Sequence, residues 1–398
     1  MSIALQSIKE LVQRSVLLEE NLKANFNAPN NQRVLDKRWP MSEVQGFVGR
    51  TDEGIRNAED RGALPKPDMN ERNNRRKGYT LPQINYMREQ FGTHPRRSPT
   101  EDDVSIIAVQ NFKGGVGKST CATHLSHYLA RQGYRVLLVD CDSQATATRF
   151  FGYNPDQDLK ESDTLLSYLA GDTQHLRNAV RDTHWEGLKL IPANLHLYAA
   201  EYMIAGRAQA NSSDQIYSLL RNGLDTVKND FDVVIIDAPP ALGMISLNVL
   251  YASNSVIVPM LPSMPDFYST IQFFTMLEEV LEHFPEDMTY DFVKVLITRK
   301  ESRTEGTSSQ DDISEDAAAF YGDYMMRSIF YKSRAIENAS SEARTIFEVN
   351  SPKDIGVDSK TFRRGIETVE DVCGEIEGYI RNTWPSEQRR NAGRVANA

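Results

Sequence analysis

The chain has 398 residues, of which 40% are hydrophobic and 25% charged, so it has material for two or three globular domains and is not collagen-like, purely coiled-coil or wholly disordered. Its 3 cysteines are scattered, no apolar run reaches the ~18 residues that span a bilayer, and the first residues lack a signal-peptide pattern, so we expect a cytoplasmic protein without disulfides. The net charge is −10, but it is unevenly distributed: residues 1–100 carry a net charge of +5 and the remainder −15.

Residues 1–26 are expected to form an amphipathic helix, followed by a linker that ends near residue 31. Apolar side chains recur at spacings of three and four, namely Leu5, Ile8, Leu11, Val12, Val16, Leu18 and Leu22. One helix cannot bury such a stripe alone, so it either packs on its own domain or pairs with a second chain. We predict that this helix makes the protein a homodimer.

Residues 32–103 read as a small DNA-binding module that ends in a proline-containing linker. Residues 41–50 predict a short helix and a turn, 51–64 a second helix, 65–78 a basic hairpin, and Thr80–Phe91 a third helix with a capping box. This layout is typical of a winged or MerR-like helix-turn-helix. The segment 72–97 carries a net charge of +6, which favours a polyanion as the partner, although a solvated basic loop would look the same.

The arginines and lysines of this module are the candidate DNA contacts. We expect Arg50, Arg56 and Arg61 near the groove, where the second helix would read base edges. We expect Arg75, Arg76 and Lys77 on the hairpin to touch phosphates or the minor groove.

The periodicity changes at residue 104. Short apolar runs such as VSIIAV, YRVLLVD, DVVIID and SVIVPM alternate with helical stretches. Continuous apolar strands separated by helices indicate a mostly parallel sheet that is covered on both faces. We therefore predict a doubly wound α/β domain over 104–385, followed by a flexible tail over 386–398.

The motif NFKGGVGKST lies between the first of these strands and a helix, which is the setting of a phosphate-binding loop. Gly114, Gly115 and Gly117 would turn backbone N–H groups onto phosphate oxygens at the positive end of the helix. Lys118 would reach the β- and γ-phosphates, and the Ser119 hydroxyl would ligate Mg²⁺. The usual motif has glycine at position 112, whereas this chain has Phe112 followed by a second lysine, Lys113.

Carboxylates follow two further strands at the edge where open α/β sheets bind ligands. In RVLLVDCDSQ these are Asp140 and Asp142, and in DVVIIDAPP it is Asp237. Asp237 suits the Mg²⁺ shell, and Asp142 suits a role in orienting an attacking water or accepting its proton. Asp140 is expected to hold the loop in place rather than to act in catalysis.

The motifs KGGVGKST, VLLVDCDSQATAT and DVVIIDAPP resemble the ParA/MinD family of deviant Walker ATPases over about residues 104–384. The front module resembles that of the large plasmid-type ParA proteins, and the stretch from EARTIFEV to EIEGYI resembles the RepA-type proteins of RepABC plasmids. The tail TWPSEQRRNAGRVANA has no apolar face, which disfavours MinD-like membrane targeting.

This resemblance implies an ATP cycle. ATP and Mg²⁺ would bind at Lys113, Gly114, Gly115, Val116, Gly117, Lys118, Ser119 and Thr120, with Tyr331 near the base. Lys113 would cross to the partner's phosphates in an ATP-bound dimer. That dimer would bind nonspecific DNA on the nucleoid, a ParB/RepB-type partner would stimulate hydrolysis, and the front module would repress the protein's own operon.

The residues allow alternatives for one basic cluster and for the function. Arg363 and Arg364 on a late helix are candidates for nonspecific DNA contact, although a solvated helix face explains them equally well. A nucleotide-switched repressor with little motor role is the main alternative function. A metal-cluster reductase of the same superfamily would need ligand cysteines that Cys373 alone cannot supply.

Overall fold

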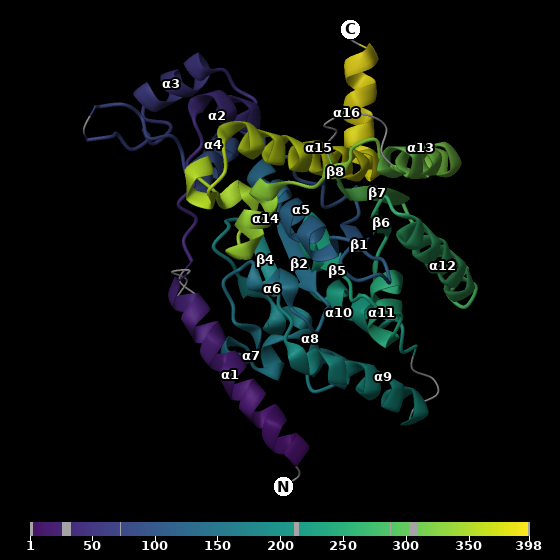
Figure 1. The fold of residues 1–398 in the computed structure, drawn as a ribbon. Helices are drawn as coiled ribbons and strands as arrows, with labels where there is room; N and C mark the ends of the chain where they lie inside the picture. Colours follow the sequence, from purple (N-terminus) through teal and green to yellow (C-terminus); the bar gives the residue numbers. More distant parts are fainter. Residues whose placement is uncertain are drawn as a thin grey trace.

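In the computed structural model, residues 3–25, 33–71, 73–210, 215–286, 288–301 and 309–396 are described. Their centre is an eight-stranded sheet in the order β3-β4-β2-β5-β1-β6-β7-β8 (Figure 1). Every neighbouring pair is parallel except β3 with β4. The predicted doubly wound α/β fold is confirmed. The strands are β1 Ser105–Val109, β2 Val136–Asp140, β3 Arg181–Asp182, β4 Leu188–Ile191, β5 Val233–Asp237, β6 Ser255–Met260, β7 Phe292–Lys300 and β8 Phe330–Tyr331.

Helices cover both faces of the sheet, because each central strand buries both sets of alternate side chains. In β5, Val233 and Ile235 belong to the core beneath α5 and α15, whereas Val234 and Ile236 belong to the core beneath α8 to α11. The helices of this domain are α5 Lys118–Gln132, α6 Thr146–Arg149, α7 Pro155–Asp158, α8 Leu165–Ala170, α9 Ala199–Ala210, α10 Leu219–Asp225, α11 Met244–Ala252, α12 Met264–Leu281, α13 Ser309–Tyr321, α14 Arg334–Ser341, α15 Ser359–Thr383 and α16 Pro385–Ala396.

The front module consists of α2 (Met41–Val48), α3 (Asp52–Asp60), α4 (Leu81–Phe91) and a hairpin between α3 and α4. Gly49 ends α2 with a φ of 64°, and the Thr51 hydroxyl caps α3 by accepting from Gly54 N. The hairpin closes through a bridge between Met69 and Arg76. Helix, turn, helix and hairpin therefore follow one another as the sequence predicts.

This module shares one hydrophobic core with the sheet domain. Trp39 packs edge-on against Trp185, with ring centroids 6.5 Å apart. The buried guanidinium of Arg88 on α4 donates to Phe47 O at 3.0 Å and to Arg131 O at 2.7 Å. Because Arg131 lies on α5, the module is held directly against the helix that follows the glycine-rich loop.

The segment expected to be a linker near residues 92–103 is packed instead. Arg97 is buried, and its guanidinium donates to Phe231 O at 3.0 Å and to Asp102 O at 3.1 Å. A buried guanidinium requires acceptors, and only the folded sheet domain brings the Phe231 carbonyl to it. The segment between the module and β1 is therefore packed into the protein interior.

The expected flexible tail over 386–398 begins instead as α16, which is described as far as Ala396. Ser386 donates from its backbone N–H at 2.9 Å and from its hydroxyl at 2.6 Å to the Asp102 carboxylate. A carboxylate at a helix N-terminus satisfies N–H groups that have no partner within the helix. Asp102, which is 284 residues away in sequence, therefore anchors the start of this helix.

The predicted N-terminal helix is present as α1 (Ile3–Asn25). Its apolar stripe faces outward: Ile8, Leu11, Val12 and Leu18 are 57–60% exposed. The expected linker over 26–31 lies outside the described residues. No helix in the described part of the chain is long and apolar enough to cross a membrane.

Candidate functional site

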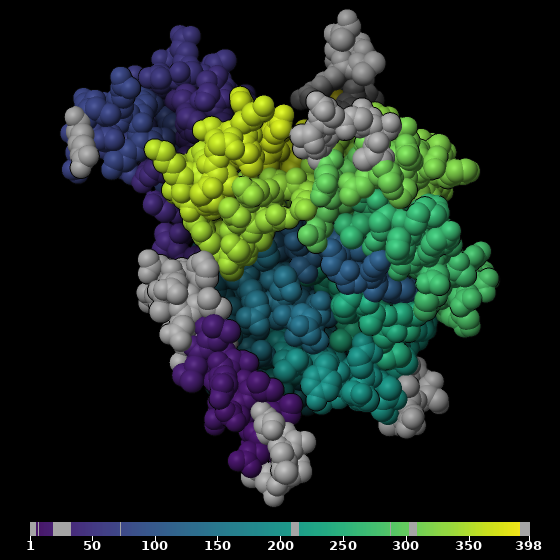
Figure 2. Space-filling view, viewed as in Figure 1, coloured from purple at the N-terminus to yellow at the C-terminus, as the bar shows by residue number. Residues whose placement is uncertain are grey.

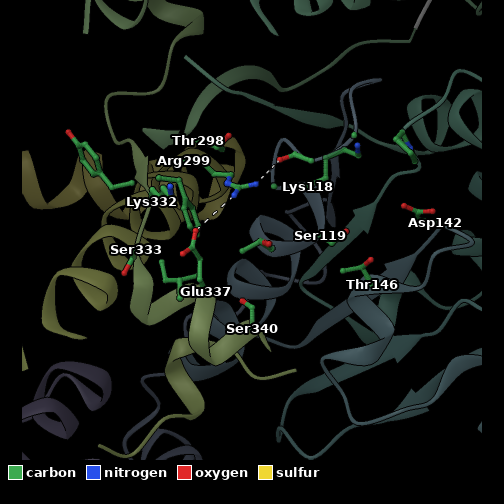
Figure 3. Close-up of a pocket in the computed structure, with 18 of the residues that line it drawn as sticks. Lys118, Ser119, Asp142, Thr146, Thr298, Arg299, Lys332, Ser333, Glu337 and Ser340 are labelled. Atoms are coloured by element: carbon green, nitrogen blue, oxygen red, sulfur yellow. Dashed lines mark hydrogen bonds and ion pairs between the residues drawn. The ribbon is translucent and has the colours of Figure 1, made fainter. Parts of the chain in front are cut away.

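The glycine-rich loop joins β1 to α5 and forms one wall of a pocket of about 580 Å³ (Figure 3). Gly115 has a φ of 79° and Gly117 a φ of 91°, values that side chains other than hydrogen rarely allow. Val116 is not among the residues that line the pocket: its side chain is buried and its carbonyl accepts from Thr298 Oγ1 at 2.7 Å. The pocket is lined by Gly114, Gly115, Gly117, Lys118, Ser119, Thr120, Asp142, Gln144, Thr146, Pro240, Thr298, Arg299, Phe330, Tyr331, Lys332, Ser333, Ile336, Glu337 and Ser340.

The two lysines of the loop have different surroundings. Lys118 is buried, its Nζ donates to Lys113 O at 3.0 Å, and desolvation lowers its pKa against the opposing effect of Asp237 and Asp142. Lys113 Nζ lies 3.0 Å from Oδ1 of Asp266, a nearly buried carboxylate in the first turn of α12. Lys118 thus lies inside the pocket, whereas Lys113 is paired within its own chain, to an acid that sequence analysis missed.

Asp237 is the best candidate for the metal site. It is fully buried at the end of β5, and neither carboxylate oxygen has a hydrogen-bond partner in the described part of the chain. Burial and the nearby Asp140 raise its pKa, while Ser119 and Lys118 oppose this effect. A buried carboxylate without partners beside a serine hydroxyl provides the hard oxygen ligands that Mg²⁺ prefers, so these residues fit the ion.

Asp140 and Asp142 occupy different positions although only Cys141 separates them. Asp140 is buried and accepts from Thr148 N at 2.8 Å and Thr148 Oγ1 at 2.7 Å, while burial raises its pKa to about 7. Asp142 lines the pocket, and its Oδ1 accepts from Gln144 N at 2.9 Å. Asp140 is thus bonded to α6 through Thr148, whereas Asp142 lies at the pocket.

The wall opposite the glycine-rich loop comes from β8, α14 and the end of β7. Tyr331 lines it, with 37% of its surface exposed. Arg299, Glu337 and Ser340 also line it, and sequence analysis missed them. The sequence signal for them was their position at or after the carboxyl ends of strands that meet at the loop's edge of the sheet.

The predicted DNA contacts of α3 and its flanks lie on the surface. Arg56 pairs with Asp52 one helical turn earlier. Arg61 Nε donates to Asn57 O at 3.0 Å, and the Arg50 guanidinium lies over the Phe91 ring at 5.3 Å. Arg75 and Lys77 on the hairpin, together with Arg363 and Arg364 on α15, are also exposed.

Arg76 differs from these expectations because it turns inward. Its Nη1 lies 2.7 Å from Glu59 Oε2 and donates to the Tyr79 hydroxyl at 2.6 Å. The Glu59 side chain is fully buried and needs a charged partner there. Arg76 therefore holds the hairpin against α3, and the exposed cations of the hairpin are its neighbours Arg75 and Lys77.

The chain is similar to known proteins over most of its length. A family model described as an AAA domain matches residues 104–290. The chain is 34% identical over 369 residues to Protein SopA of Escherichia coli K12, covering 91% of this chain and 93% of SopA. It is 28% identical over 372 residues to a putative replication protein A of Sinorhizobium fredii, covering 89% of each.

A solved structure is also similar to this chain. Cobyrinic acid a,c-diamide synthase from Mycobacterium smegmatis, solved with a bound ATP analogue and magnesium, is 31% identical with a TM-score of 0.51. The match covers 62% of this chain and 92% of that one.

Proposed function

This chain belongs to the ParA/MinD-type family of P-loop ATPases, and from this membership we propose that it is an ATP-hydrolysing DNA partition protein. The observation that carries the proposal is the convergence of Lys118, Asp142 and Asp237 at one end of the sheet, beside a loop that presents backbone N–H groups. A loop alone would support nucleotide binding, whereas a pocket-facing carboxylate and a partnerless buried one add what hydrolysis needs.

Each residue has a separate role in this reaction. The loop from Gly114 to Thr120 cradles the phosphates, and Lys118 neutralises charge that builds up on them. Ser119 and Asp237 hold Mg²⁺, which when bound stabilises charge on the phosphate oxygens. Asp142 orients the attacking water.

We also propose an ATP-bound homodimer in which Lys113 leaves Asp266 and reaches the nucleotide of the partner subunit. Its support is the second lysine of the loop, whose Nζ pairs with Asp266 of its own chain at 3.0 Å. The outward apolar stripe of α1 supports a second, nucleotide-independent contact between copies.

We propose two DNA-binding surfaces on a nucleoid-associated protein. Arg50, Arg56 and Arg61, with Arg75 and Lys77 on the hairpin, form an operator-reading surface, and Arg363 and Arg364 contact nonspecific DNA. The support is their exposure on separate elements, on α3 and its flanks and on α15. A ParB/RepB-type protein is the proposed activator, as the membership of the ParA/MinD-type family implies.

One contact favours the alternative of a nucleotide-switched repressor as a second activity of the same molecule. Helix α5 begins at the phosphate loop, and Arg88 of the front module binds its last turn through Arg131 O. A nucleotide that shifts α5 would therefore shift the module as well. Operator affinity measured with ADP, ATP and no nucleotide tests this coupling, and equal affinities would exclude it.

The test of the enzymatic proposal is ATP hydrolysis by three proteins in parallel. Wild type should release phosphate slowly, Lys118→Ala should lose both binding and hydrolysis, and Asp142→Ala should bind ATP without turnover. Asp142→Ala should then accumulate as a dimer in sedimentation velocity. Hydrolysis unchanged in Lys118→Ala would show that the activity arises elsewhere, and fast turnover by Asp142→Ala would remove that residue from catalysis.

A further inference from the structure

Arg299 has an unusual backbone at the edge of the pocket. It lies one residue before the end of β7 with a φ of 54°, where the register between β7 and β8 shifts. A residue other than glycine costs free energy at a positive φ, and this conformation persists only where the surrounding structure fixes it. Here Thr298 donates to Val116 O at 2.7 Å, and Lys300 pairs with Asp311 at 2.9 Å. Both neighbours are thus fixed in the interior, and the irregularity directs Arg299 toward the pocket.

The Arg299 guanidinium lies between the two walls of the pocket (Figure 3). Its Nη1 donates to Gly115 O at 3.4 Å, and its Nη2 lies 4.0 Å from Glu337 Oε1 on α14. Both distances are at the outer limit for such contacts, and the two side chains are 52% and 48% exposed. The backbone therefore fixes the direction of the Arg299 side chain, whereas its contacts with Gly115 O and Glu337 are weak.

A nucleotide would provide a much stronger partner. Phosphate groups carry more negative charge than one half-exposed carboxylate, and a guanidinium binds them through two parallel hydrogen bonds. Any ligand whose phosphates rest on the loop at Gly115 brings that charge next to Nη1 of Arg299. The guanidinium can then leave Glu337 for the phosphates by moving the end of the side chain alone, because the backbone already directs Arg299 toward the pocket.

We propose that Arg299 is a nucleotide-binding residue that contacts the phosphate chain, and that Glu337 competes for it in the free protein. The proposal rests on the nucleotide-binding function proposed above. It adds to the loop a cation from β7, 181 residues beyond Lys118 in the sequence. It also gives the carboxylate of Glu337 a defined effect, which is to weaken nucleotide binding.

The experiment measures the binding of fluorescent ADP to the full chain, with ATP and adenosine as competitors. Arg299→Ala should weaken ADP and ATP about tenfold, the loss expected for one charge-assisted contact, and should leave adenosine unchanged. Arg299→Gly should show the same loss, and because glycine tolerates the positive φ, it should unfold at no lower temperature than wild type. Glu337→Gln should bind ADP and ATP more tightly than wild type, an effect that a merely structural residue would not produce.

The control is Arg327→Ala, which removes an exposed arginine outside the pocket lining and should bind like wild type. Unchanged ADP affinity in both Arg299 variants, with wild type binding normally, would overturn the proposal and leave the proposed function standing. An equal loss of adenosine would also overturn it, because Arg299 would then act on the base. Failure of wild type to bind any nucleotide would instead refute the proposed function itself.

Discussion

Replacing Asp237 with asparagine should stabilise the nucleotide-free protein while destroying its metal site. Asp237 is fully buried, its oxygens have no partner among the described residues, and Asp140 lies close enough to raise its pKa further. A buried polar group without partners costs about 1–3 kcal/mol, and a charged one more. Asp237→Asn keeps a buried polar group of almost the same volume but removes its charge and the repulsion from Asp140. The free energy of unfolding should therefore rise by about 1 kcal/mol, the extra cost of a buried charge over a buried neutral amide.

The assay is urea denaturation in EDTA, followed by repetition with ADP and Mg²⁺. Ligand at 100 times its dissociation constant should stabilise wild type by about 2.7 kcal/mol, and the part of this gain that requires Mg²⁺ should vanish in Asp237→Asn. Hydrolysis should be lost as well, since the metal no longer has its carboxylate.

Asp232 provides a matched control, because it is equally buried but fully paired. Its Oδ2 accepts from Arg135 N at 2.8 Å, and its Oδ1 lies 2.7 Å from Arg135 Nη2. Asp232→Asn should therefore lower the free energy of unfolding by about 1.5–3 kcal/mol, the opposite sign. If Asp237→Asn were also less stable than wild type in EDTA, the reasoning from the partnerless carboxylate would be refuted.

Three further predictions concern other contacts. Asp266→Asn removes the ion pair of Lys113, so the ATP-dependent dimer should tighten about tenfold in sedimentation equilibrium; an unchanged dimer constant would show that the pair does not compete with dimerisation. Burial lowers the pKa of His124 to about 4 and of His127 to about 3, so the unfolded state binds more protons below pH 6.5 and the free energy of unfolding should fall by about 2 kcal/mol per histidine from pH 7 to pH 5. The raised pKa of Asp140 acts in the opposite direction over this range, so the test is the difference between variants: His127→Gln should lose about 2 kcal/mol less than wild type from pH 7 to pH 5, and identical pH profiles would contradict it. Leu11→Glu with Leu18→Glu, on the exposed stripe of α1, should leave the nucleotide-free protein monomeric if α1 pairs the chains; a variant that still sediments as a dimer would place the contact elsewhere.

The sequence by itself determined the sheet, the glycine-rich loop and the place of the carboxylates at the ends of β2 and β5. These features are local: the loop needs glycine where φ is positive, and each parallel strand is a continuous apolar run whose carboxyl end reaches the same edge. The different surroundings of Asp140 and Asp142 were not given by their spacing, because residues two apart in a strand share a face; they depend on Thr148 of α6, which bonds to Asp140.

Only the tertiary structure decided which side chains meet across long distances in the sequence. The pairing of Lys113 with Asp266 and the place of Arg299 opposite Glu337 both depend on how α12, β7 and α14 pack around the loop. The same reason explains Arg76. The sequence predicted an exposed DNA contact there, but the fold buries Glu59, and Arg76 pairs with it. A local pattern records what one segment prefers, whereas the partner of a buried charge is set by whichever distant segment the fold brings to it.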